Sequence, residues 1–322
     1  MFRELGTYLQ ALKESTDIDI RMFILNQTYS KKPEKMYVIK KVNIGGGAKE
    51  IFKEILALNI EKLKTSVERG ERRMRDFFDF NASSFDVFTI LPDQVDAFPY
   101  ILNQINQYSS LETLTNVSDI KRIKGYAIEV RPESNGRLIY FRKFSESKIL
   151  SRKGFLPMVL YRGVFDSVKG DVFTIDGGVD CIYIENTQAG IIIVNNKGSF
   201  EDLFNFKEFY KLRAYDALTS LKASEIIEIP EEIIELASQK TRYARKITNL
   251  IKAAAFDETL REAFSTSKER LPGLKFEISN GKIRIQDEDG LKHFIDVWED
   301  NLVESIARRR IYRALSKEEF EG

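Results

Sequence analysis

The sequence predicts a mixed α+β protein, in which an α/β region with an antiparallel meander precedes a mainly helical region. In the first third, runs rich in β-branched and aromatic residues alternate with helical patterns. The middle consists of short apolar runs separated by Gly, Asp and Asn, as in antiparallel sheets. The last third has helical periodicity with one hairpin. We therefore expect two domains, over residues 1–205 and 206–322.

The first 107 residues are expected to alternate strands and helices. A helix opens the chain, because charges interrupt the apolar core that a signal peptide would need. Another helix is expected over residues 93–107. In the helix predicted between them, the apolar side chains at helical spacing are Ile51, Ile55, Leu58 and Leu63. The strands of this part are predicted at 18–26, 35–44 and 85–91.

The middle of the chain is expected to be an antiparallel sheet. The turn-forming RPESNG separates strands at 121–130 and 136–144, which predicts a hairpin. Further short strands at 159–195 predict a meander. Ser199 and Asp202 then match a capping box for the next helix.

The last third should be helical apart from one hairpin. Residues 231–255 contain neither Gly nor Pro and predict one long helix. Asn280–Gly281 lies between two alternating runs and predicts a hairpin over 274–287. A closing helix is expected over 291–315.

Composition excludes several kinds of chemistry. No apolar run approaches the roughly 20 residues that span a bilayer. The single Cys181 allows no internal disulfide, and with the single His293 it excludes zinc sites built from several Cys or His. The helical pattern around His293 favours a structural, partly buried role. The Gly-rich turn at 43–51 lacks the nucleotide-binding patterns, so we predict no cofactor, no metal and no catalytic residue.

Acids and the only cysteine crowd into FTIDGGVDCIYIENTQAG, residues 173–190. Asp176 followed by two glycines predicts a tight turn, with glycine supplying positive φ. Asp180 and Glu185 are five residues apart on a strand and face opposite sides, which is a poor geometry for one metal. We therefore interpret the acids as turn formers and surface charge, and Cys181 as core.

Basic residues give the clearest functional signal. Between Lys121 and Lys153 there are ten basic and three acidic residues, whereas 155–206 is mainly acidic and would suit a protein partner or a dimer contact. On a helix, Arg242, Arg245, Lys246 and Asn249 share one face, opposite Ala244, Ile247 and Ile251. Basic surfaces bind nucleic acid by neutralising phosphates, and the interleaved Tyr126, Tyr140 and Phe141 would stack on bases. The candidate DNA-binding residues are Arg72, Arg73, Arg142, Lys143, Arg242, Arg245, Lys246, Lys252, Arg308, Arg309 and Arg310.

Two blocks within residues 159–210, FTID-x-x-VDCIYI and FE-x-LFNF-x-x-FY, carry a family resemblance. With GRLIYFRKFSESKIL upstream, they make the chain resemble the KwaB-like B subunit of the Kiwa anti-phage defence system. The resemblance implies a DNA-binding effector that works with a membrane-embedded partner subunit and obstructs phage DNA replication or transcription. These blocks are packing and turn motifs, so they imply no catalytic residue.

We therefore expect a cytoplasmic DNA-binding defence protein that is a homodimer or higher homo-oligomer. A membrane-embedded partner would recruit it to the inner membrane, and DNA binding would be largely independent of sequence. Two alternatives stay open: a scaffold that contacts no nucleic acid, and a metal-dependent nuclease. The nuclease would use Asp166, Asp171, Asp176 and Asp180.

Overall fold

The chain folds into two compact units, each built around its own secondary structure. Unit 1 comprises Met1–Arg75 and Ser84–Phe204, and unit 2 comprises Asp76–Ser83 and Asn205–Gly322. The short excursion at 76–83 is a feature that the sequence pattern did not indicate. The computed structural model describes residues 2–14, 18–79, 82–83, 85–115, 123–131, 136–144, 149–150, 158–161, 164–167, 172–173, 177–185, 190–253, 256–304 and 311–313.

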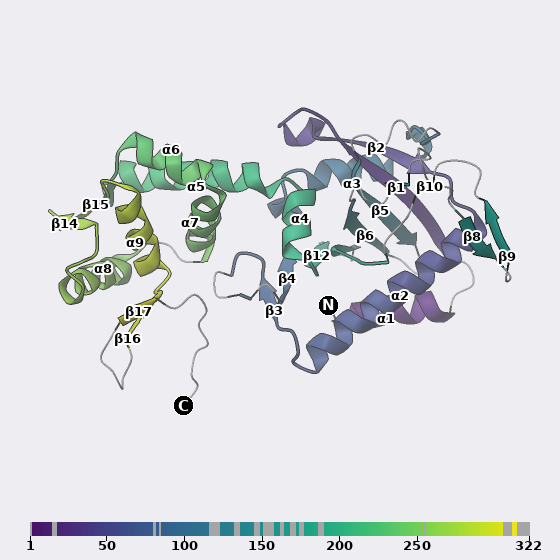
Figure 1. Ribbon diagram of the computed structural model, residues 1–322, viewed down its shortest axis with the longest axis horizontal. Helices are drawn as coiled ribbons and strands as arrows, with labels where there is room; N and C mark the ends of the chain where they lie inside the picture. Colours follow the sequence, from purple (N-terminus) through teal and green to yellow (C-terminus); the bar gives the residue numbers. More distant parts are fainter. Residues whose placement is uncertain are drawn as a thin grey trace. The chain divides into compact units, whose positions relative to one another are not determined.

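Unit 1 is organised by an eight-stranded sheet (Figure 1), with strand order β2-β1-β5-β6-β11-β12-β4-β3. All pairings from β2 to β4 are antiparallel. The mixed α+β class and the β5–β6 hairpin are thereby confirmed. The strands are β1 (Asp19–Gln27), β2 (Tyr37–Val42), β3 (Met74–Asp76), β4 (Val87–Ile90), β5 (Ile123–Arg131), β6 (Arg137–Lys143), β11 (Cys181–Glu185) and β12 (Ile191–Val194).

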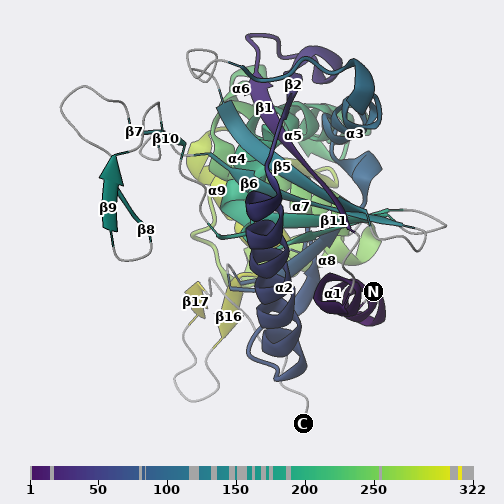
Figure 2. The same cartoon turned by 90° about the vertical axis from the view of Figure 1, so that its right-hand side faces the viewer.

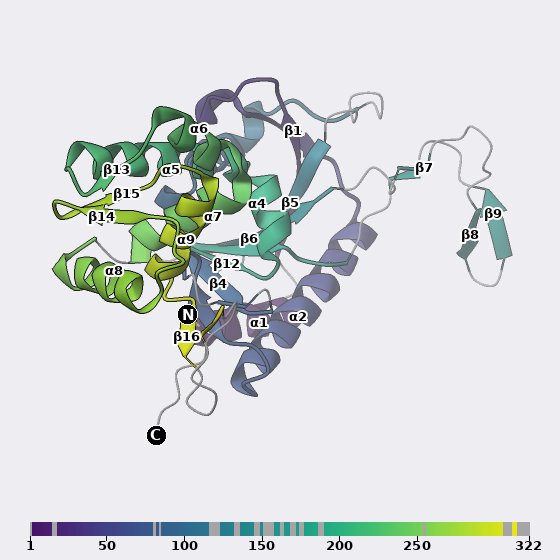
Figure 3. The same ribbon diagram turned by 60° about the vertical axis from the view of Figure 1, so that its left-hand side comes forward.

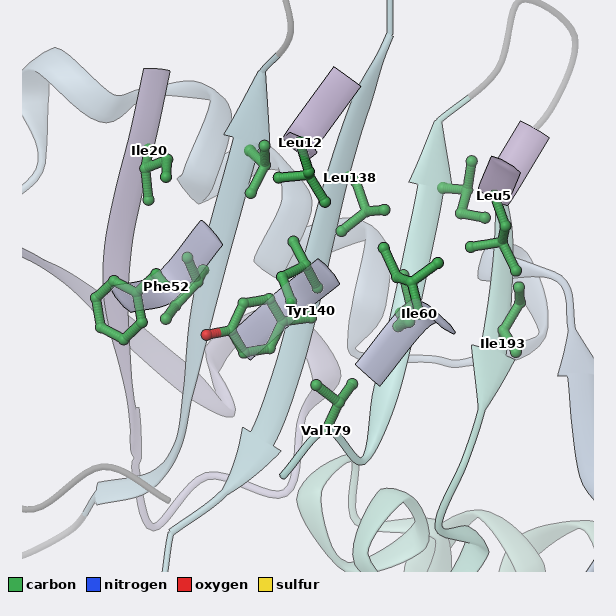
Figure 4. Close-up of a cluster of buried hydrophobic side chains, with 14 of the residues drawn as sticks. Leu5, Leu12, Ile20, Phe52, Ile60, Leu138, Tyr140, Val179 and Ile193 are labelled. Atoms are coloured by element: carbon green, nitrogen blue, oxygen red, sulfur yellow. The ribbon is translucent and has the colours of Figure 1, made fainter. Parts of the chain in front are cut away.

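Two helices, α1 (Phe2–Glu14) and α2 (Gly46–Glu68), cover one face of this sheet. Figure 2 shows α2 lying across the strands, and Figure 4 shows Leu5, Leu12 and Ile60 packed on residues of the sheet. The predicted apolar face of α2 is only partly correct, because Leu63 is buried but Ile51 and Leu58 are exposed. The side chains of α2 that enter the core are Phe52, Leu56, Ile60 and Leu63.

The opposite face carries α3 (Phe98–Asn106), which follows a short 3-10 turn, and α4 (Lys197–Leu203). The Phe98 ring lies 5.5 Å from that of Phe141 and 5.1 Å from that of Tyr183, between ring centres. Since both faces are covered, the central strands are buried on both sides. Tyr126, Tyr140 and Phe141 are therefore core residues, and the prediction that they stack on bases is wrong.

The strands between residues 149 and 194 do not form one meander. β8 (Met158–Tyr161) and β9 (Val164–Ser167) pair as a hairpin apart from the large sheet (Figure 2). β7 (Ile149–Leu150) pairs with β10 (Val172–Phe173), whereas β11 and β12 join the large sheet. The sequence correctly predicted strands that pair antiparallel. The local pattern could not show which strands share a sheet.

The start of α4 corrects the predicted capping box. Its N-cap is Asn196, whose Oδ1 accepts a hydrogen bond from the backbone N–H of Ser199 at 3.0 Å. The helix ends where Asn205 adopts left-handed φ of 56°, and α5 (Phe206–Ala223) begins directly afterwards. Asn tolerates this conformation better than most residues.

Unit 2 is mainly helical (Figure 3), with a three-stranded sheet of order β13-β15-β14. The predicted Asn280–Gly281 hairpin is confirmed, because both residues have the positive φ of a tight turn, 52° and 73°. The remaining elements are α6 (Glu231–Gln239), α7 (Thr241–Ala253), α8 (Glu258–Arg270), α9 (Glu288–Trp298), β13 (Ile227–Glu228), β14 (Glu277–Ser279), β15 (Lys282–Arg284), β16 (Leu302–Glu304) and β17 (Ile311–Arg313).

Two predicted helices of this unit are shorter than expected. The helix over 231–255 is broken at Lys240, whose ψ of 100° is extended, so that α6 and α7 are separate. The closing helix ends at Trp298, and β16 and β17 form a hairpin in place of its remainder. Neither break contains Gly or Pro, so no local breaker marked either of them.

Candidate nucleic-acid interface

Several predicted DNA-binding residues lie at one end of the large sheet. β5 begins, β6 ends, β11 begins and β12 ends there, because neighbouring strands run antiparallel. Side chains from these strand ends meet Arg72 from the loop before β3 and Asp202 from α4. We call this set the sheet-end cluster: Arg72, Lys124, Arg142, Lys143, Asp180, Asn195 and Asp202.

Asp180 occupies the centre of the sheet-end cluster and is fully buried. Its Oδ1 accepts a hydrogen bond from Arg142 Nη1 at 2.7 Å, and its Oδ2 accepts one from the backbone N–H of Lys143 at 2.7 Å. Burial raises the pKa of the Asp180 carboxyl, although these two hydrogen bonds oppose the shift. The prediction that Asp180 is a surface charge is wrong, since it fixes the end of β6 to the start of β11.

Gly178 has a role that differs from the predicted one. Neither Gly177 nor Gly178 has a positive φ, and Asp176 lies outside the described residues. A Cβ atom at Gly178 would lie 2.8 Å from Cζ of Arg142. The absence of a side chain at this position therefore leaves room for the guanidinium that reaches Asp180.

Asp202 holds two lysines of the sheet-end cluster together. Its Oδ1 accepts a hydrogen bond from Lys124 Nζ at 2.7 Å, and its Oδ2 lies 2.5 Å from Lys143 Nζ. Burial alone would raise the pKa of Asp202, but the hydrogen bonds from both lysines outweigh it, so the pKa lies below its ordinary value. The carboxylate is thus held ionised between two cations from β5 and β6.

Arg72 is held entirely by acceptors of its own unit. Its Nε donates to the carbonyl of Phe85 at 2.7 Å, and Nη1 donates to Oδ1 of Asn195 at 2.6 Å. Nη2 donates to the carbonyl of Asn195 at 3.0 Å. Burial lowers the pKa of this guanidinium. Arg72 therefore joins the loop before β3 to the end of β12, while the adjacent Arg73 is exposed.

The carboxylates of the nuclease alternative are not brought together in the part of the chain that the structure describes. Asp166 lies on β9, in a different sheet from the strands beside Asp180. Asp171 and Asp176 lie outside the described residues. Among the described side chains, no group of three or more His, Cys, Asp or Glu could hold a metal ion.

The single histidine and the single cysteine have structural surroundings. His293 Nδ1 accepts a hydrogen bond from the backbone N–H of Lys275 at 3.0 Å, and the side chain is half-buried. Cys181 is fully buried in the sheet, and burial raises the pKa of its thiol well above the ordinary value. Because the thiolate is the reactive form, this cysteine is a poor nucleophile.

Helix α7 presents its cations differently. Arg242, Arg245 and Lys252 are exposed, and we call these three the α7 basic face. The guanidinium of Arg245 lies 5.7 Å from the ring centre of Tyr210 on α5, and Lys252 Nζ lies 5.1 Å from that of Phe78. Aromatic rings at these distances attract cations without neutralising them.

The predicted helical face of α7 is only partly correct. Ala244 and Ile247 are buried as expected. Asn249, expected on the basic side, is buried, whereas Ile251, expected on the apolar side, is exposed. Helix α7 packs against α5, α6 and α9, so its buried surface is wider than a single stripe.

Lys246 is not part of the α7 basic face. Lys246 forms an ion pair with the buried carboxylate of Glu299 in the segment after α9. Arg308, Arg309 and Arg310 lie outside the described residues.

Comparison with known proteins identifies the family. The model of the family described as "Kiwa protein KwaB-like" matches residues 120–307. The chain belongs to the KwaB-like family of Kiwa proteins. It is accordingly a component of the Kiwa anti-phage defence system, as the resemblance predicted. No curated protein and no solved structure matches the chain.

The matched region contains the α7 basic face and the whole sheet-end cluster apart from Arg72. It includes the strands that carry Lys124 and Arg142, the adjacent Asp180, and all helices from α4 to α9. None of the described helices is both long enough and apolar enough to cross a membrane.

Sequence reasoning gave no role to two basic residues, one in the sheet-end cluster and one on α9. Lys124 was counted among the basic residues but was not assigned a role, and Lys292 on α9 was overlooked. Lys292 had a signal, since it follows Glu288 by four residues on the same side of a helix. Lys124 gains its role only through Asp202, which lies 78 residues further along the chain.

Proposed function

We propose that this Kiwa component binds DNA through the α7 basic face, largely independently of sequence. The observation that supports it is the exposure of Arg242, Arg245 and Lys252 along one helix, with Arg245 and Lys252 supported by aromatic rings. Exposed cations of this kind neutralise backbone phosphates and release counterions. The sheet-end cluster is left out of this interface, because Arg72, Arg142 and Lys143 are engaged within the chain.

The family membership supports a wider proposal about how DNA binding is used. The protein acts in the cytoplasm as a homodimer or higher homo-oligomer, and a membrane-embedded partner subunit recruits it to the inner membrane. Bound phage DNA is then blocked in replication or transcription. Support for the partner and for the block comes from the resemblance alone, and Arg73 and Arg308 to Arg310 stay predictions for further phosphate contacts.

The test measures binding of fluorescent duplexes of unrelated sequence by anisotropy over a range of salt concentrations. We expect replacement of Arg242, Arg245 and Lys252 by Ala to weaken binding about tenfold or more on every duplex, and to reduce the salt slope by up to about 2.7, at about 0.9 per phosphate. Lys246 is kept, because its removal would leave Glu299 buried without its cation.

The matched control replaces Lys222, Arg270 and Lys282 by Ala, which removes the same charge from other elements of unit 2. Its salt slope should equal that of the unmodified protein. If both triple variants bind alike, the interface lies elsewhere. If the unmodified protein shifts no DNA at low salt, the scaffold alternative is preferred.

A further inference from the structure

A small basic cavity lies between α7 and α9 in unit 2. Its volume is about 130 Å³, well above the roughly 15 Å³ that one water molecule requires. Three of its five lining residues are cations, one is a tyrosine, and none is acidic. The lining residues are Arg242, Tyr243, Lys246, Lys292 and Ile295.

Two of the polar groups in this cavity already have partners. Lys246 Nζ pairs with the carboxylate of Glu299, which is also bonded to Asn301. The hydroxyl of Tyr243 donates to Glu288 Oε1 at 3.0 Å, and Glu288 Oε2 accepts a hydrogen bond from Lys240 Nζ at 2.6 Å. These contacts hold the walls of the cavity in place and neutralise the two nearby carboxylates.

Arg242 and Lys292 are the two lining cations that take no part in these contacts. Within the described residues neither makes an ion pair or a hydrogen bond, although the charge of Lys292 helps to lower the pKa of Glu288. Among the five lining residues, Lys246 is the cation that an ion pair neutralises, through Glu299. The lining therefore keeps two cations without an ion pair, Arg242 on α7 and Lys292 on α9.

We propose that this cavity binds a single phosphate group, and that in the protein's function this group is one phosphodiester of the DNA backbone. The guanidinium of Arg242 supplies a planar fork for two phosphate oxygens, and Lys292 supplies a point charge from the opposite wall. The inference rests on the proposed DNA binding and adds to it a residue outside the α7 basic face. A phosphate held in a cavity also fixes the register of the duplex, which surface cations alone do not.

The decisive variant is Lys292→Ala, since Lys292 lies on α9 and takes no part in the α7 basic face. With fluorescent duplexes, we expect weaker binding on every sequence and a salt slope reduced by up to about 0.9, as for one lost phosphate contact. Arg270→Ala is the matched control, with the same loss of charge at the end of α8. Unfolding midpoints of all variants establish that each is folded.

A double-mutant cycle with Arg242→Ala tests whether both residues hold one phosphate. Two cations that share a ligand are coupled, so the double variant should lose less affinity than the product of the single losses. Independent losses would mean that Arg242 and Lys292 bind separate phosphates, which would overturn the shared site.

The effect of inorganic pyrophosphate on the unfolding midpoint distinguishes a site for free phosphate from a site for the DNA backbone. If DNA binds but Lys292→Ala behaves as the Arg270→Ala control does, the cavity proposal fails while the proposed function stands. If DNA does not bind, the proposed function fails; pyrophosphate that stabilises the unmodified protein but not Lys292→Ala would still support a phosphate cavity. If neither DNA nor pyrophosphate has any effect, the cavity proposal is overturned as well.

Discussion

The sheet-end cluster and the α7 basic face come from equally basic stretches of sequence, yet the fold uses them in opposite ways. In the sheet-end cluster, Arg142 and Lys124 pair with Asp180 and Asp202, which lie 38 and 78 residues further along the chain. On α7, two of the three cations lie over aromatic rings at the surface. The density of basic residues in a stretch of sequence therefore does not indicate whether they are available to a ligand.

The difference has a simple electrostatic reason. A buried carboxylate is costly unless a cation and hydrogen-bond donors compensate it, so Asp180 requires Arg142 and the Lys143 backbone. The ring of Phe78 attracts Lys252 without neutralising its charge. The first arrangement contributes to folding, and the second is the one that we propose for DNA binding.

The largest effect is expected for Asp180→Ala. Its removal leaves Arg142 without its buried carboxylate and the Lys143 N–H without its acceptor, so the free energy of unfolding should fall by about 3–5 kcal/mol. Urea denaturation measures this, with the exposed Asp216→Ala of α5 as the control, expected within about 0.5 kcal/mol of the unmodified protein. Equal stabilities of the two variants would contradict the structural role of the sheet-end cluster.

A second comparison replaces one arginine of each region by Ala. Arg72→Ala removes hydrogen bonds to Phe85 and Asn195 and should lower the free energy of unfolding by about 1.5–3 kcal/mol, without changing the salt slope of DNA binding. Arg242→Ala should do the reverse, with stability within about 0.5 kcal/mol and a reduced slope. An Arg72→Ala variant that is stable but defective in DNA binding would reverse the assignment of the two regions.

The smallest effect concerns pH. The pKa of Asp202 is lowered on folding, so its interaction with Lys124 and Lys143 stabilises the protein above the ordinary pKa of 3.8 and is lost as the pH falls through the folded value. Asp202 is partly exposed, so the contribution should stay below about 1 kcal/mol. Urea unfolding of the unmodified protein and of Asp202→Asn should differ by a constant amount above about pH 5 and converge below it. A difference that grows on acidification would contradict this sign.

Short-range patterns predicted the parts of the fold that depend on neighbouring residues. The Asn280–Gly281 turn and the β5–β6 hairpin are confirmed, because turn chemistry and strand alternation are local. The family was recognised from its motifs, although those motifs lie in core strands and helices rather than in a binding surface. The functional hypothesis therefore rests on the charge pattern. The structure places the basic residues in two different surroundings, the sheet-end cluster and the α7 basic face.

The wrong predictions share a cause, which is dependence on distant partners. Helix α2 carries two apolar stripes, and the one that faces the sheet is longer, extending at helical spacing from Phe52 to Leu63. The predicted stripe shares Leu63 with it, but Ile51 and Leu58 are exposed, so only the packing against the strands decides between the two. The same limit explains Asp180, whose burial cannot be inferred without Arg142, and Lys292, whose cavity exists only where α9 meets α7.

The order of strands in the large sheet has a consequence for the region shared by the family. Residues 120–307 include β5 and β12, but the strands that pair with them, β1 and β4, lie earlier in the chain. A fragment limited to the shared region would leave the edges of two buried, apolar strands open to other molecules. Such edges pair readily between chains, so the first hundred residues protect the family region from aggregation as well as completing its core.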